Sequence, residues 1–173
     1  MMKKLLFTLV ALMAVMTVQA QSICASWRCM QPMVQTEEDG SVVIQNPMYT
    51  FNEDGTYYLA NEMTMSTPPA QTMEMEIAVN MELKGTYTLE GDKLTLTPNA
   101  DTYKADVLSI SQNGKVTNNP MVKSSVKQML NSKEAKDEAA EVSSFTVTVS
   151  DKMLEMKDGD ETMSLVRIST IKN

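Results

Sequence analysis

The chain contains no histidine, two cysteines, one tryptophan and only 5% aromatic residues among its 173 residues. Without histidine, Ser-His-Asp and Cys-His catalytic arrangements and every histidine-ligated metal site are excluded. Basic residues are also few, since 15 Lys and Arg stand against 22 Asp and Glu and give a formal net charge of −7. Nucleic-acid binding requires a basic surface, so we expect no nucleic-acid partner. The length and the hydrophobic content of 43% are those of one globular domain.

The first twenty residues have the pattern of a secretory signal peptide. Lys3 and Lys4 form a basic start, residues 5–18 are almost wholly apolar, and Ala20 ends a small-residue cleavage site. This apolar stretch is too short to span a membrane, and no other long apolar stretch follows. We therefore expect an exported protein, periplasmic or extracellular after cleavage near Ala20. It would have one mature domain over residues 21–173 and no membrane span.

The two cysteines, Cys24 and Cys29, are close in sequence. On an extended strand they would point to opposite faces and lie about 16 Å apart, whereas a disulfide needs a Cα separation of about 4.4–6.8 Å. A bridge would therefore require the chain to turn at Ala25-Ser26. The sequence leaves open a disulfide or two unpaired cysteines. Neither a CxxC motif nor a second pair indicates a redox or metal role.

Most of the remaining chain alternates between apolar and polar residues. In residues 73–82 the odd positions are apolar and the even positions are mostly acidic or small, which is typical of a half-buried strand. Hairpins are expected over residues 48–59, 85–97 and 145–169, and further strands at 26–35 and 103–111. This spacing predicts an all-β protein, an up-and-down antiparallel barrel of about 8–10 strands, with a flattened sandwich as the alternative.

Residues 119–141 interrupt the β pattern. Asn119 is a plausible helix N-cap with Pro120 at the first helical position, and Asn131 is a plausible cap for a second segment. An apolar stripe is formed by Val122, Val126, Met129 and Leu130. We expect one kinked helix or two short ones, inserted before the last three strands. This insertion would cover an open end of the β structure or act as a lid over a ligand.

Three features in this order resemble the lipocalin-like β-barrels that bacteria secrete. They are Trp27 in the first strand, the hairpin at residues 51–57, and the segment 85–97 together with a last strand that contains Arg167. The resemblance covers essentially the whole mature chain. It departs at Ala25, where the wider lipocalin group has glycine. The resemblance implies an antiparallel barrel with Trp27 near its closed end and Arg167 against the indole, both in structural roles.

Methionine is unusually abundant, with 17 residues against three phenylalanines. The close pairs are Met30/Met33, Met63/Met65, Met73/Met75 and Met153/Met156. Thioethers in an exported protein raise the possibility of copper(I) binding, because soft sulfur ligands suit that ion. Met73 and Met75, however, share a strand face with Ile77 and Val79, which is typical of a core or a lumen. We therefore predict no metal site and keep copper(I) as a third hypothesis.

The leading hypothesis is an exported, non-catalytic barrel without a cofactor that binds a small apolar molecule in its lumen. Tyr57 or Tyr87 would orient that ligand through its hydroxyl group. The expected lining residues are Tyr57, Leu59, Met63, Met65, Met73, Met75, Ile77, Tyr87, Phe145 and Val147. The alternative is an envelope protein-interaction module with a filled core and no ligand. We expect no enzyme, because the acidic residues fall mainly in predicted turns and the chain has no nucleotide-binding fingerprint.

Overall fold

The computed structural model describes residues 23–37, 40–67 and 74–169 of the chain. The expected signal peptide over 1–20 and the lining residue Met73 lie outside the described residues. The strands are β1 (Ser26–Cys29), β2 (Met33–Glu37), β3 (Gly40–Phe51), β4 (Thr56–Ser66), β5 (Met75–Glu90), β6 (Lys93–Pro98), β7 (Lys104–Gln112), β8 (Lys115–Val116), β9 (Ser143–Val149), β10 (Met153–Asp158) and β11 (Glu161–Ser169). The helices are η1 (Ala100–Thr102), α2 (Pro120–Leu130) and α3 (Lys133–Ala139).

Eight strands close into an antiparallel barrel. Around the barrel the order is β3, β4, β5, β6, β9, β10, β11, β1 and back to β3, with every neighbouring pair antiparallel. Nearly all neighbours are also successive in the chain, because only β2 and the segment from β7 to α3 leave the ring. The predicted all-β barrel with a helical insertion before its last three strands is confirmed.

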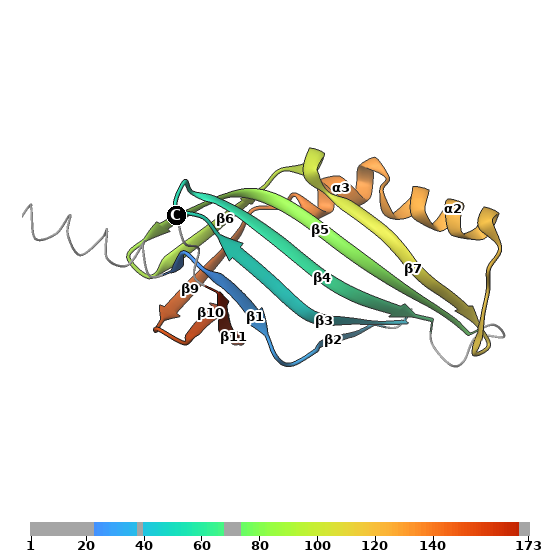
Figure 1. Ribbon diagram of the computed structural model, residues 1–173, viewed down its shortest axis with the longest axis horizontal. Coiled ribbons are helices and arrows are strands. Elements are labelled where there is room, and N and C mark those ends of the chain that lie inside the picture. Colours follow the sequence, from blue (N-terminus) through green and yellow to red (C-terminus); the bar gives the residue numbers. More distant parts are fainter. Residues whose placement is uncertain (1–22, 38–39, 68–73, 170–173) are drawn as a thin grey trace, which may run out of the picture.

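Three of the barrel strands continue beyond the ring as an extension of the same sheet. There β3 gains β2 as a neighbour along residues 40–44, and β5 gains β7 along residues 75–82, while β4 stays between β3 and β5. Figure 1 shows these strands running together away from the barrel, with α2 and α3 alongside β7. A register shift at residues 45–48 of β3 accompanies the transition, and Asn46 within it has a φ of +49°. The bulge lets the sheet bend where it leaves the barrel.

The inside of the barrel is filled with large apolar side chains. Trp27, Phe51, Leu94, Leu154 and Leu165 are each fully buried there. The strands supply these residues at alternate positions because successive side chains of a strand point to opposite faces. A second, smaller cluster lies on the extended sheet and includes Val79, Leu83, Tyr103 and Ala105. The protein therefore has one core inside the barrel and another under the helices.

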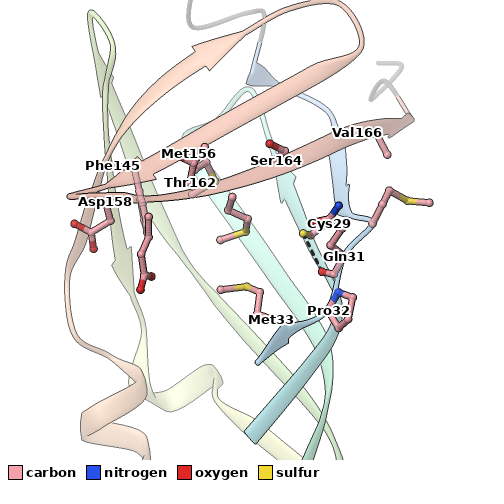
Figure 2. Close-up of a pocket in the computed structure, with 13 residues that line it drawn as sticks. Cys29, Gln31, Pro32, Met33, Phe145, Met156, Asp158, Thr162, Ser164 and Val166 are labelled. Atoms are coloured by element: carbon pink, nitrogen blue, oxygen red, sulfur yellow. Dashed lines mark hydrogen bonds between the residues drawn. The ribbon is translucent and has the colours of Figure 1, made fainter. Parts of the chain in front are cut away.

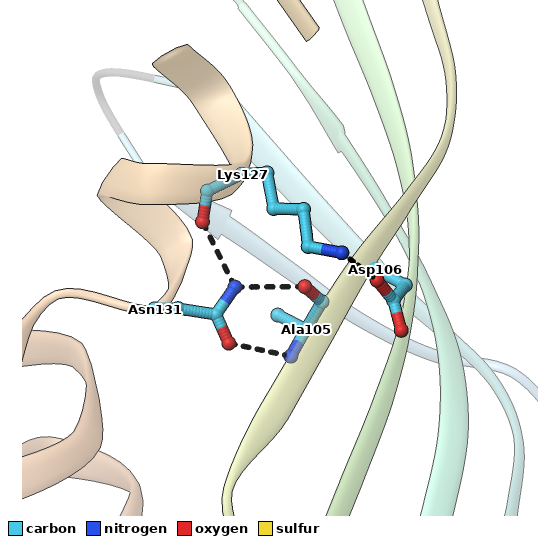
Figure 3. Close-up of polar contacts among 4 residues, drawn as sticks. All are labelled: Ala105, Asp106, Lys127 and Asn131. Atoms are coloured by element: carbon cyan, nitrogen blue, oxygen red, sulfur yellow. Dashed lines mark hydrogen bonds and ion pairs between the residues drawn. The ribbon is translucent and has the colours of Figure 1, made fainter. Parts of the chain in front are cut away.

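The two helices lie along the otherwise open edge of β7, as Figure 3 shows. The backbone N–H of Ala105 donates to Asn131 Oδ1 at 3.0 Å, and Asn131 Nδ2 donates to the Ala105 carbonyl at 2.8 Å. The side-chain amide thus occupies the hydrogen-bonding positions that another strand would take. Lys127 also pairs with Asp106, and the ammonium group holds the pKa of that carboxyl below its usual value. These contacts protect an edge that could otherwise pair with another chain.

The helical segment agrees with the sequence prediction at its start and differs further on. Asn119 caps α2, with Pro120 in its first turn. Asn131, predicted to cap the second segment, is instead the C-cap of α2, and Ser132 caps α3 through a bond from the Ala135 N–H to its hydroxyl. Met129, predicted on the packed stripe, is 60% exposed. The reason is that α2 contacts only the edge strand, so only a narrow part of its surface is covered.

Two strand boundaries also differ from those expected. The strands expected over 73–82 and 85–89 are not separate, because residues 75–82 and 85–89 both belong to β5. Gly85 pairs with both Tyr57 and Pro98 and interrupts neither ladder. The single strand expected over 26–35 is two strands, β1 and β2, separated by residues 30–32. Pro32 lies in that corner, and it lacks the N–H that a continuous ladder would need. This corner has a direct bearing on the candidate site.

Candidate functional site

An apolar hollow of about 430 Å³ lies at one end of the barrel, between the β1–β2 corner and the β10–β11 hairpin. Figure 2 shows the side chains of Cys29 and Met33 directed into it. We call it the mouth hollow. Its lining consists of Cys29, Met30, Gln31, Pro32, Met33, Phe145, Met156, Asp158, Glu161, Thr162, Met163, Ser164 and Val166. Four of these residues are methionines, so the surface is apolar, polarisable and able to adapt to different shapes.

Strand alternation explains why these methionines meet. On β10, Leu154 and Met156 are buried while Glu155 faces solvent. Met156 lies directly opposite Met163 of β11, so both side chains are on the inner face. Met33 comes from the first residue of β2, outside the closed ring, where it pairs with Ile44. The corner after β1 therefore brings a methionine of the extended sheet over the end of the barrel.

Polar groups lie around the mouth hollow and not across its centre. The Cys29 thiol donates to the Gln31 carbonyl at 3.2 Å, a contact visible in Figure 2. Asp158 and Glu161 are cross-strand neighbours at the turn between β10 and β11, and both are exposed. The hollow therefore combines an apolar lining with two carboxylates at one side. This arrangement suits an apolar or cationic guest better than an anionic one.

A second hollow, of about 300 Å³, lies on the extended sheet. It brings together three residues that sequence analysis placed in the lining, Met65, Met75 and Ile77, and adds Val42. We call it the sheet hollow. Met63, also expected in the lining, packs with Met65 and Ile77 against the second core cluster. These methionines are half-buried, so this face of the sheet is only partly covered.

The other expected lining residues lie in or against the core of the barrel. Tyr57 and Val147 are buried members of that core, and Leu59, Tyr87 and Phe145 pack against it. Phe145 also reaches the mouth hollow. The predicted set is therefore divided between the barrel core and the extended sheet. Sequence alternation identified the inward faces of the strands, but not which parts of those faces remain open.

The two tyrosines expected to orient a ligand are held within the barrel. The Tyr87 hydroxyl donates to the Asn52 carbonyl at 2.8 Å and contacts Cys24 Sγ at 3.3 Å. Burial raises the pKa of Tyr87, and the hydrogen bond with Cys24 raises it further. Burial likewise raises the pKa of Tyr57. Both phenols therefore stay protonated at pH values above those at which tyrosine usually ionises. Neither residue lines the mouth hollow.

The contact expected between Trp27 and Arg167 is present. The guanidinium carbon lies 4.8 Å from the indole ring centre, and the two residues are partners in the β1–β11 ladder. The indole N–H also donates to the Ile23 carbonyl at 2.7 Å, so the buried ring has its polar group satisfied. A cation–π contact of this kind contributes about 0.5–2 kcal/mol. Cys24 and Cys29 are both buried and no disulfide joins them, which answers the question of a bridge.

Of the residues that line the mouth hollow, sequence analysis named only Phe145, and it missed the sulfur-bearing Cys29, Met33, Met156 and Met163. Two close pairs, Met30/Met33 and Met153/Met156, gave a partial signal. The sequence could not show that Met33 and Met156 would face the same space, because that depends on the β1–β2 corner and on the register between β10 and β11. Met30 lies at the exposed side of the hollow, and Met153 is exposed outside it.

Two further hollows are lined mainly by polar residues. One, of about 980 Å³, lies beside Tyr58, Lys84 and Asn99, and the other, of about 350 Å³, lies beside Asn46 and Asn61 at the β3 bulge. Within the described ranges, no three His, Cys, Asp or Glu side chains are grouped so that they could hold a metal ion. The same residues include no helix of the length and hydrophobicity needed to cross a bilayer.

The described residues thus define a closed eight-stranded antiparallel barrel with a methionine-lined hollow at one end. No protein-family model matches the chain, and no curated protein matches it. Among solved structures, it is similar to a crystal structure of an uncharacterized protein from Bacteroides eggerthii DSM 20697. The two chains are 12% identical, the match covers 83% of this chain and 97% of that one, and the TM-score is 0.40.

Proposed function

We propose that the protein is an exported, non-catalytic, lipocalin-like barrel that binds a small apolar molecule in the mouth hollow. The observation that carries this proposal is the volume of about 430 Å³ lined by four methionines and Phe145. Ligand pockets typically measure about 300–1,000 Å³ and are mainly apolar with a few polar groups. Because Trp27, Phe51 and Leu154 fill the barrel, the ligand is placed at its end and not along its axis.

The size of the hollow sets the expected affinity. A guest that buries about 300 Å² of apolar surface gains roughly 7 kcal/mol, at about 25 cal/mol per Å². That free energy would correspond to a dissociation constant of about 1–10 µM, and the guest's loss of translational and rotational freedom weakens the binding from that value. The carboxylates of Asp158 and Glu161 disfavour anionic head groups, so neutral molecules are expected to bind better than fatty acids of similar size.

A neutral fluorescent probe, N-phenyl-1-naphthylamine, tests this proposal. Mature protein should bind it with micromolar affinity, and Met33→Asp should weaken binding at least tenfold by placing a charge in the hollow. Met121→Asp is the matched control, because Met121 is 77% exposed on α2, away from the site. Equal loss in the two variants, or no binding by the wild-type protein of this or any other neutral apolar probe, would refute the proposal.

The second candidate is an interaction module at the cell envelope that binds another protein. The filled barrel core favours it, and so do apolar side chains exposed on the extended sheet, namely Val34, Leu108 and Val116. Pull-down from envelope extracts with wild-type protein and a Val34→Lys/Leu108→Lys variant tests it. A partner that is lost in the variant, with probe binding unchanged, would favour this candidate over the first.

A further inference from the structure

Five sulfur-bearing side chains line the mouth hollow. Four of them come from four different strands, namely Cys29 at the end of β1, Met33 at the start of β2, Met156 on β10 and Met163 on β11. The fifth, Met30, lies between β1 and β2 and is 66% exposed. Cys29 and Met156 are almost fully buried, and Met33 and Met163 are half-buried. Two of these four sulfurs are therefore fixed by core packing, while the other two lie on the more accessible side. Figure 2 shows Cys29 and Met33 on adjoining walls of this space.

The chemistry of this set is soft and nearly uniform. Thiolate and thioether sulfur prefer copper(I), whereas magnesium and calcium take oxygen ligands, and the chain has no histidine to offer imidazole. One thiolate with three neutral thioethers also balances the single positive charge of copper(I). The complex would then carry no net charge, so its burial in an apolar hollow would avoid the large cost of burying an ion. Asp158 and Glu161, which line the same hollow, favour the approach of a cation.

We propose that the mouth hollow is a copper(I) site whose ligands are the thiolate of Cys29 and the thioethers of Met33, Met156 and Met163. On binding, the Cys29 S–H bond breaks, an S–Cu bond forms, and the proton passes to solvent. The hydrogen bond from the thiol to the Gln31 carbonyl is lost at the same step. Copper stays in the +1 state throughout, so no oxidant or reductant takes part.

This inference goes beyond the apolar-ligand proposal, and a leucine substitution separates the two. Met33→Leu and Met163→Leu keep the hollow apolar and of similar volume but remove a sulfur ligand. We expect these variants to bind copper(I) at least tenfold more weakly and still to bind the naphthylamine probe, since leucine keeps the apolar surface that the probe contacts and removes only the sulfur. Volume-conserving exchanges of this kind generally cost less than about 1.5 kcal/mol of stability. Both variants are therefore expected to fold.

The test is an anaerobic titration of mature protein with copper(I) in competition with bicinchoninate. We expect one equivalent bound, with a thiolate-to-copper charge-transfer band in the ultraviolet. Cys29→Ser should lower the affinity by more than about 100-fold, since even outer-shell substitutions at metal sites cost about 10–100-fold. The controls are Cys24→Ser, because Cys24 contacts Tyr87 inside the barrel, and Met121→Leu on the exposed face of α2. Both should bind copper(I) like the wild-type protein.

Four results would overturn the proposal. The first is wild-type protein that fails to compete with bicinchoninate for copper(I). The second is a copper(I) affinity of the leucine variants equal to that of the wild-type protein. This result decides the question even if Cys29→Ser does not fold. The third is an X-ray absorption spectrum of the copper-loaded wild-type protein with a nitrogen or oxygen first shell in place of sulfur. Zinc in a parallel titration should bind at least 100-fold more weakly, and equal binding of zinc would equally reject a site selective for copper(I).

Discussion

Replacing Gly85 with alanine is expected to destabilise the barrel where β5 passes from the ring into the extended sheet. A Cβ atom at this position would lie 2.3 Å from the Thr97 carbonyl oxygen, 2.7 Å from Tyr57 Cε1 and 2.8 Å from Pro98 Cα. Favourable contacts between such atoms are at about 3.5–4.0 Å. The Tyr57 ring can rotate, but the other two atoms belong to the backbone of β6. The methyl group therefore forces β5 and β6 apart by roughly 1 Å.

The expected loss follows from two opposing effects. Overpacking of this kind costs about 1–3 kcal/mol, and the backbone contacts place Gly85 at the upper end of that range. Alanine also restricts the unfolded chain, which returns about 0.4–1 kcal/mol. The net loss is about 2 kcal/mol of unfolding free energy. In a chain of this size, that lowers the melting temperature by roughly 4–8 °C.

Urea unfolding followed by the fluorescence of Trp27, the single tryptophan, measures this loss. Gly91→Ala is the matched control, because Gly91 has a φ of +67° and no atom within 4 Å of an added Cβ. The loss of stability in Gly91→Ala measures only the cost of placing alanine in the left-handed backbone conformation, about 1 kcal/mol. If Gly85→Ala unfolds at the wild-type urea concentration, or loses less stability than Gly91→Ala, the argument from close contact between β5 and β6 is wrong.

Two further predictions concern other parts of the fold. Burial raises the pKa of Tyr49 from 10.0 to about 12. The contribution of the neutral Tyr49 side chain to the free energy of unfolding is therefore complete below pH 10 and is lost as the pH rises toward 12. The loss is about 1.4 kcal/mol per pH unit. Urea midpoints at pH 9, 10 and 11 should therefore decline less for Tyr49→Phe than for the wild-type protein, and equal declines would contradict the prediction. Asn131→Ala removes both hydrogen bonds to Ala105 and should cost about 1–2 kcal/mol. It should also promote self-association through the β7 edge, and light scattering that gives the variant the same molar mass as the wild-type protein would count against this role of the amide.

Local pattern was sufficient for much of the architecture. Alternation in residues 75–82 placed Met75, Ile77 and Val79 on one face, and in the structure Met75 and Ile77 line the same hollow while Ile77 packs against the cluster that contains Val79. Asn119 followed by Pro120 marked the start of α2. These features depend on a few neighbouring residues, because a strand has a period of two and a helix cap needs one side chain and the next turn.

The register shift in β3 could not be read in this way. Ile44, before the bulge, lies opposite Met63, and Tyr49, after it, lies opposite Leu59. Even positions before the shift and odd positions after it therefore share one face. The same shift marks where the strands leave the barrel, so no count of strands along the chain would reveal that the sheet continues outside the ring. Strand pairing across the sheet decides this, and alternation along one strand does not.

The amino-acid sequence by itself determined the β class, the helical insertion and the abundance of methionine in place of aromatic residues. Only the tertiary structure decided which methionines meet. Met73 and Met75, close in sequence, gave the stronger local signal, while the mouth hollow is built from Met33, Met156 and Met163 around Cys29. The physical reason is that a side chain's face follows from its neighbours in the chain, whereas its partners in space follow from how distant strands close into a barrel.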